Sequence, residues 1–232
     1  MTTLENTSSH RNTAIIVGIF FIIATVASIS TFLFIGFLSD LDYLVKVSSN
    51  ENQVLGGMFL ELIWALAVLG IPVFLYPILR KHNEALALGF YSLRFIEALL
   101  TIIYSLSLLV LLTLSQEFTK AGAPETSYYQ TAGVLLLAAR DWAFIIGPGL
   151  AFTLSALILN YQLFQTRLIP RWLSGWGFLG AALMFIPFLI QFFGIESLDL
   201  LFLPIAVQEM VFALWLIGKG FDSSAIAALY AN

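Results

Sequence analysis

Six charged side chains lie within runs of apolar residues, and they are the groups in this sequence best suited to chemistry. A charge at the centre of a bilayer costs about 2.5–3.5 kcal/mol, so each is expected to face a partner or water instead of lipid. Two arginines cannot neutralise four acids, and the surplus indicates either protonated carboxyls or a bound cation or amine. The six residues are Glu61, Arg94, Glu97, Arg140, Asp141 and Glu209.

The stretch YSLRFIEALL, residues 91–100, places Arg94 and Glu97 on one face of a helix because they are three positions apart. Small and polar residues continue this face at spacings of three and four. Such a stripe predicts the wall of a cavity inside a helical bundle. Its members are Arg94, Glu97, Ala98, Thr101 and Ser105.

The helical rise of about 1.5 Å per residue arranges these charges by depth in the membrane. Arg94 and Glu209 share a depth of about 12–14 Å from the inner boundary, which predicts an ion pair between their helices. Glu97 lies at about 18 Å, Glu61 at about 27 Å and Asp141 at about 34 Å. All are expected to point inward together, and the predicted ligand-binding residues are Glu61, Arg94, Glu97, Arg140, Asp141, Trp142 and Glu209.

Two structural explanations compete with ligand binding for these charges. Arg94, Glu97 and Glu209 could form a buried pair or triad that only locks helices in register. The charges nearer the outer interface could simply reach water along their own side chains. The number of charges favours function, since six charged groups spread over four helices are costly for stapling alone.

The elements that position these charges are membrane-spanning helices. The 232 residues are 60% hydrophobic and 10% charged, with a mean hydropathy of +0.95, whereas soluble domains are about 25% charged. A bilayer core takes roughly 20 apolar residues per helix, and long unbroken runs exclude the alternation of a β-barrel. We therefore predict an all-α integral membrane bundle of six transmembrane helices, near residues 12–37, 54–79, 85–114, 131–164, 172–193 and 198–217.

Lys and Arg are concentrated on one side of these helices, at both chain ends and after the second and fourth runs. Because cytoplasmic loops carry the excess of Lys and Arg, both termini are predicted to be cytoplasmic. The expected organisation is an N-terminal tail of residues 1–11, a six-helix domain of residues 12–219 and a C-terminal tail of residues 220–232. The segment SDLDYLVKV, residues 39–47, predicts a short interfacial helix.

Two glycine motifs indicate packing more than chemistry. GWGFLG, residues 175–180, lies in an apolar run with no preceding strand, so it predicts close helix packing instead of nucleotide binding. GPG, residues 147–149, predicts a kink or local unwinding in the fourth helix.

No cofactor is indicated by the sequence. It has no cysteine, and its two histidines lie at the membrane edge, which excludes a bis-histidine haem or a zinc site in the bundle. The formal charge of −4 argues against a nucleic-acid partner. A hard cation held by Glu61, Glu97, Asp141 and Glu209 is a further alternative. The expected partners are membrane lipids and a small-molecule or ion ligand, with the oligomeric state left open.

Three functions are consistent with these residues. The first is binding, transport or sensing of a small molecule or ion in an outward-opening cavity, where Arg94 holds an anionic group or a carboxylate while Glu97 and Glu209 bind a cation or exchange a proton. The second is an intramembrane enzyme acting on a lipid or isoprenoid, with Asp141 or Glu97 as general acid or base. The third is a structural or partner membrane subunit.

Four motifs resemble those of the bacterial membrane family catalogued as domain of unknown function 4386. They are LELIWALAVLGIPVFLYPILRKHNEALALGFYSLRFIEALL, AARDWAFIIGPGL, LIPRWLSGWGFLGA and LPIAVQEMVFALWLIGKGF. The resemblance implies a multi-pass protein of the bacterial plasma (inner) membrane. It also implies a frequent histidine before the Asp–Trp pair, where this chain has Arg140, so that a fixed positive charge would replace a proton relay. The motif positions that it matches are Glu61, Arg94, Glu97, Asp141, Trp142, Pro148 and Glu209.

Overall fold

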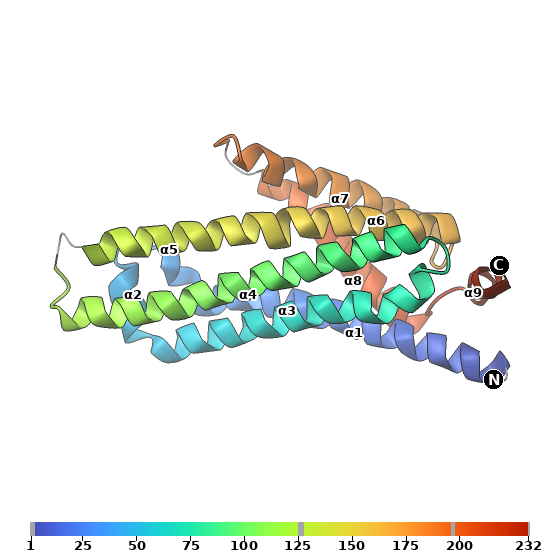
Figure 1. The fold of residues 1–232 in the computed structure, drawn as a ribbon, viewed down its shortest axis with the longest axis horizontal. Coiled ribbons are helices and arrows are strands. Elements are labelled where there is room, and N and C mark those ends of the chain that lie inside the picture. The colour runs from blue at the N-terminus through green and yellow to red at the C-terminus, as the bar shows by residue number, and fades with distance from the viewer. Residues whose placement is uncertain (1–2, 125–127, 196–197, 232) are drawn as a thin grey trace.

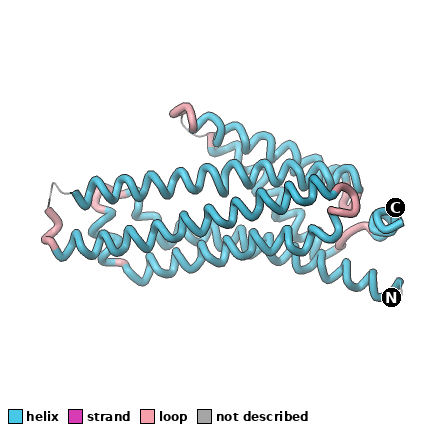
Figure 2. Tube along the Cα trace, in the orientation of Figure 1, coloured by secondary structure: helices cyan, strands magenta, loops and turns pink. Residues whose placement is uncertain are grey.

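The described part of the chain is helical, as Figures 1 and 2 show. The computed structural model describes residues 3–124, 128–195 and 198–231. Six helical segments in these ranges are long and apolar enough to cross a membrane, which confirms the predicted number of spans. The elements are α1 (Thr3–Ile35), η1 (Gly36–Ser39), α2 (Tyr43–Ser49), α3 (Glu51–Leu79), α4 (Glu84–Lys120), α5 (Tyr128–Phe144), the π-helix η2 (Ile145–Ala151), α6 (Phe152–Thr166), α7 (Arg171–Gln191), η3 (Asp199–Phe202), α8 (Leu203–Gly218) and α9 (Ser223–Ala231).

The helices pack mainly on their neighbours in the chain. Helix α1 lies against α3, α3 against α4, and α4 against α5 and α6, while α8 closes the bundle between α1 and α7. Both termini lie at one end of the molecule, here named the terminal end, and α4 finishes at the opposite, distal end (Figure 1).

The spanning helices differ in length. Helix α4 has 37 residues, whereas α7 has 21 and α8 has 16. At about 1.5 Å per residue, α7 matches the bilayer core of about 30 Å and α4 exceeds it by roughly 25 Å. Because α7 stops partway along the bundle in Figure 1, the excess length of α4 extends toward the distal end.

Two apolar clusters fill most of the interior. One, in the terminal half, joins α1, α3, α4, α6, α7 and α8 around residues such as Phe21 and Phe212. The other, at the distal end, includes Leu44 and Val47 of α2, both buried. The Ser115 hydroxyl of α4 donates a hydrogen bond to the Leu44 carbonyl. The short helix predicted in SDLDYLVKV is thus formed, and it is packed into the distal end of the bundle.

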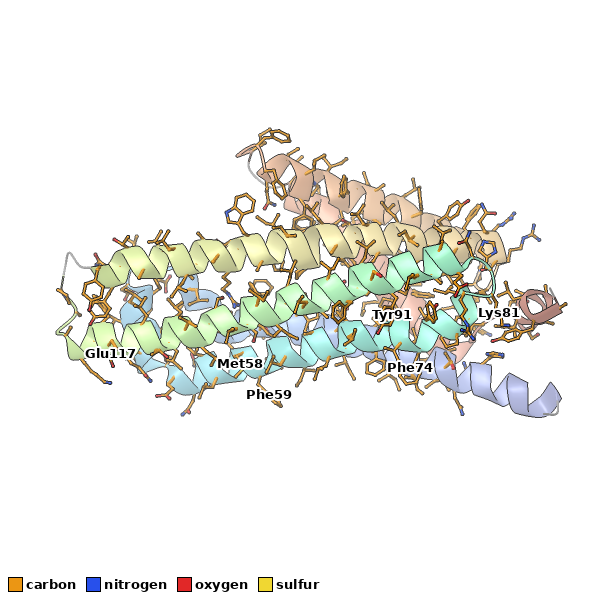
Figure 3. All side chains as sticks on the ribbon, in the orientation of Figure 1. Met58, Phe59, Phe74, Lys81, Tyr91 and Glu117 are labelled. Atoms are coloured by element: carbon orange, nitrogen blue, oxygen red, sulfur yellow. The ribbon has the colours of Figure 1, made fainter. Side chains whose placement is uncertain are left out.

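Apolar side chains also cover the outside of the bundle, as lipid contact requires. Phe59 and Phe74 of α3 point away from it in Figure 3 and are 61% and 37% exposed. Charged side chains gather at the ends, with Glu117 at the distal end and Lys81 at the terminal end.

Glycines allow α7 to approach its neighbours closely, as the GWGFLG motif predicted. A Cβ atom on Gly177 would lie 2.2 Å from Oδ1 of Asn160 in α6, and one on Gly180 would lie 3.0 Å from the backbone nitrogen of Ile205 in α8. By contrast, a Cβ on Gly175 would meet only the Phe164 ring, at 3.8 Å.

Gly180→Ala is expected to lower the free energy of unfolding by about 1–3 kcal/mol, because the new methyl group pushes against the backbone of α8. Gly175→Ala is the matched control and should be neutral or stabilising by up to about 1 kcal/mol, since alanine is the better helix former. Denaturant titration of the purified protein in detergent, followed by tryptophan fluorescence, measures both. Equal midpoints for the two variants would contradict a tight crossing of α7 and α8 at this glycine.

Candidate functional site

Arg94 lies between two carboxylates in the middle of the bundle. Its Nη1 is 3.2 Å from Oε2 of Glu97, one turn further along α4, and its Nη2 is 3.5 Å from Oε1 of Glu209 in α8. The side chains of Arg94 and Glu97 are 2% and 3% exposed, whereas that of Glu209 is 17% exposed. The predicted ion pair between Arg94 and Glu209 is confirmed, and Glu97 joins it to make a triad.

Aromatic rings surround the arginine of this triad. The guanidinium carbon of Arg94 lies 4.9 Å from the centroid of the Phe152 ring and 5.7 Å from that of Phe21. Ring faces attract a cation, and this attraction is stronger where water is excluded. The rings therefore help to hold the positive charge in place, while the buried Nε of Arg94 has no hydrogen-bond partner among the described residues.

A pocket of about 190 Å³ borders all three members of the triad. Its other walls are mostly apolar and aromatic, with the hydroxyls of Thr25 and Ser28 as the additional polar groups. One wall residue, Phe32 of α1, is 60% exposed, so the pocket reaches the outside of the bundle. It is lined by Phe21, Ala24, Thr25, Ser28, Phe32, Trp64, Val68, Ile71, Arg94, Glu97, Phe144, Pro148, Phe152, Met184 and Glu209.

The π-helix η2 shapes one side of this pocket. It contains the GPG motif, so the predicted local unwinding is present there as a wider helical turn. A Cβ on Gly147 would lie 2.5 Å from Cβ of Leu100, and one on Gly149 would lie 2.6 Å from the ring of Phe188. The two glycines thus let η2 approach α4 and α7, and Pro148 between them lines the pocket.

A second buried ion pair lies nearer the distal end. Arg140 of α5 donates to both carboxylate oxygens of Glu61 in α3, with Nη1 3.3 Å from Oε2. Nη1 also donates to the Tyr104 carbonyl at 2.5 Å, and the guanidinium carbon lies 3.3 Å from the centroid of the Tyr104 ring. The side chains of Glu61 and Arg140 are 0% and 4% exposed. This pair is closed and fully matched, as a structural staple would be.

Comparison with known families fits this arrangement. A model of the family described as domain of unknown function 4386 matches residues 16–220, which is most of the chain. The chain belongs to this family. The matched residues include both buried ion pairs. The match to domain of unknown function 4386 also confirms the resemblance seen in the four motifs. No curated protein and no solved structure matches the chain.

Within this family member, two predicted site residues do not point inward. Asp141 is exposed, and Trp142 is 44% exposed and packs against the Phe192 ring with centroids 5.3 Å apart. The expectation that all six charges converge is therefore wrong for Asp141. Consecutive helical residues are about 100° apart, so the turn that directs Arg140 toward Glu61 directs Asp141 away.

The predicted polar stripe on α4 is also only partly correct. Arg94 and Glu97 line the pocket, but Thr101 donates to the Glu97 carbonyl at 2.8 Å and Ser105 donates to the Met58 carbonyl at 3.2 Å. These hydroxyls are buried at helix contacts and do not line the cavity.

The four-carboxylate metal site is not formed either. Glu61 is paired with Arg140, and Asp141 is on the surface, so neither joins Glu97 and Glu209. Among the described residues, no group of three His, Asp or Glu side chains is placed to hold a metal ion.

Sequence reasoning missed the pocket's contribution from α1. Thr25 and Ser28 are three residues apart and so share a helix face, which is a weak signal of a polar wall. The aromatic lining gave no signal in the sequence, because Trp64 and Phe144 are residue types that are also common in an ordinary apolar core. In the structure their ring centroids are 6.3 Å apart.

Proposed function

We propose that the protein binds a small cationic molecule or ion in the pocket beside Arg94, Glu97 and Glu209, as a step in transport or sensing. In this proposal it lies in the bacterial plasma membrane with both termini in the cytoplasm, as the distribution of Lys and Arg favours. The observation that carries the proposal is the pocket itself, which borders all three charged side chains.

The charge of the triad favours a positive ligand. With all three groups ionised, two carboxylates and one guanidinium sum to −1, and no further cation lies within salt-bridge distance of them among the described residues. A bound monovalent cation would neutralise the site. Glu209 is the accessible acid, because its side chain is more exposed than those of its partners.

The walls of the pocket set limits on this ligand. Aromatic faces such as Phe21, Trp64 and Phe144 suit an organic cation. A volume of about 190 Å³ is below the range of about 300–1,000 Å³ typical of drug-sized ligands, so the ligand is small.

Entry from the side of the bundle is part of this proposal. Along the bundle axis, the Glu61–Arg140 pair and the distal apolar cluster fill the space between the pocket and the distal end. The exposed wall residue Phe32 and the partly exposed Glu209 lie on α1 and α8. A route between these helices therefore has more support than the outward opening expected from the sequence.

Tetramethylammonium is a suitable probe of this site. In detergent-purified protein, tetramethylammonium chloride is expected to raise the unfolding temperature by about 2–4 °C, equivalent to about 1 kcal/mol. The reference is N-methylglucamine chloride at equal ionic strength, because this cation is larger and its hydroxyl groups suit the mostly apolar walls poorly. Glu209→Gln should abolish the difference between the two salts because it removes the accessible negative charge.

Glu84→Gln is the matched control, since it neutralises an exposed carboxylate at the start of the same helix that carries Arg94. It should keep the full response to tetramethylammonium. The proposal is wrong if Glu209→Gln folds normally and responds to the probe as the unmodified protein does.

An intramembrane enzyme has less support from the structure. Of its two candidate acids or bases, Glu97 borders the pocket, whereas Asp141 lies outside it on the surface. The two carboxylates are thus not brought to one reaction centre.

A further inference from the structure

A second pocket, of about 730 Å³, lies at the terminal end and shares no lining residue with the pocket beside the triad. It is formed by the α6–α7 connection and the α8–α9 connection. Three of its lining residues are cations, Arg167, Arg171 and Lys219, and one is an acid, Asp222. This concentration of positive charge in a hollow is not used by the proposed cation site.

The three cations have no acidic partner. Among the described carboxylates, none lies within salt-bridge distance of them. Asp222 is engaged elsewhere, because its Oδ1 accepts hydrogen bonds from the backbone nitrogens of Ser224 and Ala225, each at 2.9 Å. With all four groups ionised, three cations and one acid leave the pocket with a net charge of +2.

The pocket is held in shape by contacts between its two connections. The backbone nitrogen of Asp222 donates to the Leu168 carbonyl at 2.9 Å, and the Leu168 side chain is buried. Arg11 of α1 donates to the Leu216 and Ile217 carbonyls at 2.9 and 2.5 Å, which caps the end of α8 beside Lys219. The hollow is therefore part of the folded structure.

Tryptophans place this pocket at the level of the lipid headgroups. Trp215 lines the pocket, and its ring contacts that of Trp172 with centroids 6.4 Å apart. Trp172 also contacts Trp176 at 6.5 Å. Tryptophan is enriched where hydrocarbon meets headgroups, so a group in this pocket would be within reach of a lipid whose chains lie along α7.

We propose that this pocket binds a phosphate group carried by the headgroup of an anionic phospholipid. Arginine can hold a phosphate through two parallel hydrogen bonds, and Arg171 is already oriented by the Phe164 ring, 5.0 Å from its guanidinium carbon. Basic pockets between helices at the membrane surface attract such headgroups. Free phosphate has the same chemistry, but only the lipid also accounts for the neighbouring tryptophans.

The test compares lipids retained by the purified full-length protein in native mass spectrometry. Phosphatidylglycerol and phosphatidylcholine with identical chains are added in equal amounts, and the ratio of bound lipids is measured. The variant Arg167→Asn/Lys219→Gln is expected to lower the preference for phosphatidylglycerol about tenfold. Asparagine is chosen because Arg167 has a φ of 58°, a left-handed conformation that asparagine tolerates.

The matched control is Arg80→Gln/Lys81→Gln, which removes two exposed cations at the same end but outside the pocket. It should keep the preference, and an equal loss in both double variants would overturn the proposal. In a separate arm, inorganic phosphate is titrated by calorimetry. Phosphate that binds alone and displaces phosphatidylglycerol would show that the source is a soluble compound and overturn the lipid assignment.

Discussion

Arg140→Ala is expected to lower the free energy of unfolding by about 3–5 kcal/mol. The reason is that Glu61, with a 0% exposed side chain, would be left as a buried carboxylate without its partner. The Tyr104 carbonyl would lose one donor as well, although it would keep the hydrogen bond from the Ser107 hydroxyl. Denaturant titration in detergent measures the change.

The double variant Glu61→Leu/Arg140→Met separates a loss of charge pairing from a loss of packing. Apolar residues of similar size can replace a buried ion pair at little cost, so this variant should recover most of the lost stability. Arg140→Lys should be intermediate, because an ammonium group cannot hold both oxygens of Glu61 in the same way. A double variant as unstable as Arg140→Ala would show that the pair is not a simple staple.

Arg94→Gln is expected to cost about 3–5 kcal/mol as well, since it leaves two carboxylates facing each other in the bundle without a cation. Because the site would then carry two negative charges, we also expect a stronger response to tetramethylammonium in any folded fraction. The unfolding midpoint with and without the probe gives both results.

The two carboxylates of the triad should differ in how strongly they are coupled to Arg94. A double-mutant cycle with Glu97→Gln is expected to give the larger coupling energy, because Glu97 is buried and 3.2 Å away. The cycle with Glu209→Gln should give a smaller one, since Glu209 is 3.5 Å away and partly exposed. Equal coupling in the two cycles would argue against Glu209 being the free acid of the site.

The number and order of the membrane-spanning helices could be predicted because hydropathy adds up along each run. Their lengths could not. The third run was predicted to end near residue 114, but α4 continues to Lys120. Beyond the membrane, polar residues such as Gln116 still form helix, since α2 and α5 pack against this extension. The length of an apolar run therefore indicates how much of a helix lies in the bilayer, and not where the helix ends.

The site was predictable only where depth decides the contacts. Arg94 and Glu209 meet because equal depth on two inward-facing helices brings them together. The pairing of Arg140 with Glu61 depends instead on the direction in which each helix face turns, and the hydropathy of α5 does not reveal it. The pocket needs side chains from α1, α3 and α7 as well, and no spacing along one helix relates them.

The π-helix η2 has a consequence for how the two ion-pair sites are related. Arg140, Phe144, Pro148 and Phe152 follow one another at intervals of four, and in a regular α-helix such intervals would rotate the last of them by about 120° from the first. The wider turn absorbs part of this rotation, so Arg140 reaches Glu61 while Phe152 reaches Arg94. The rotation of this helix between Arg140 and Phe152 therefore fixes the directions of both side chains relative to each other. A single-residue deletion between them would turn one of the two away from its partner, even if neither Arg140 nor Phe152 were removed.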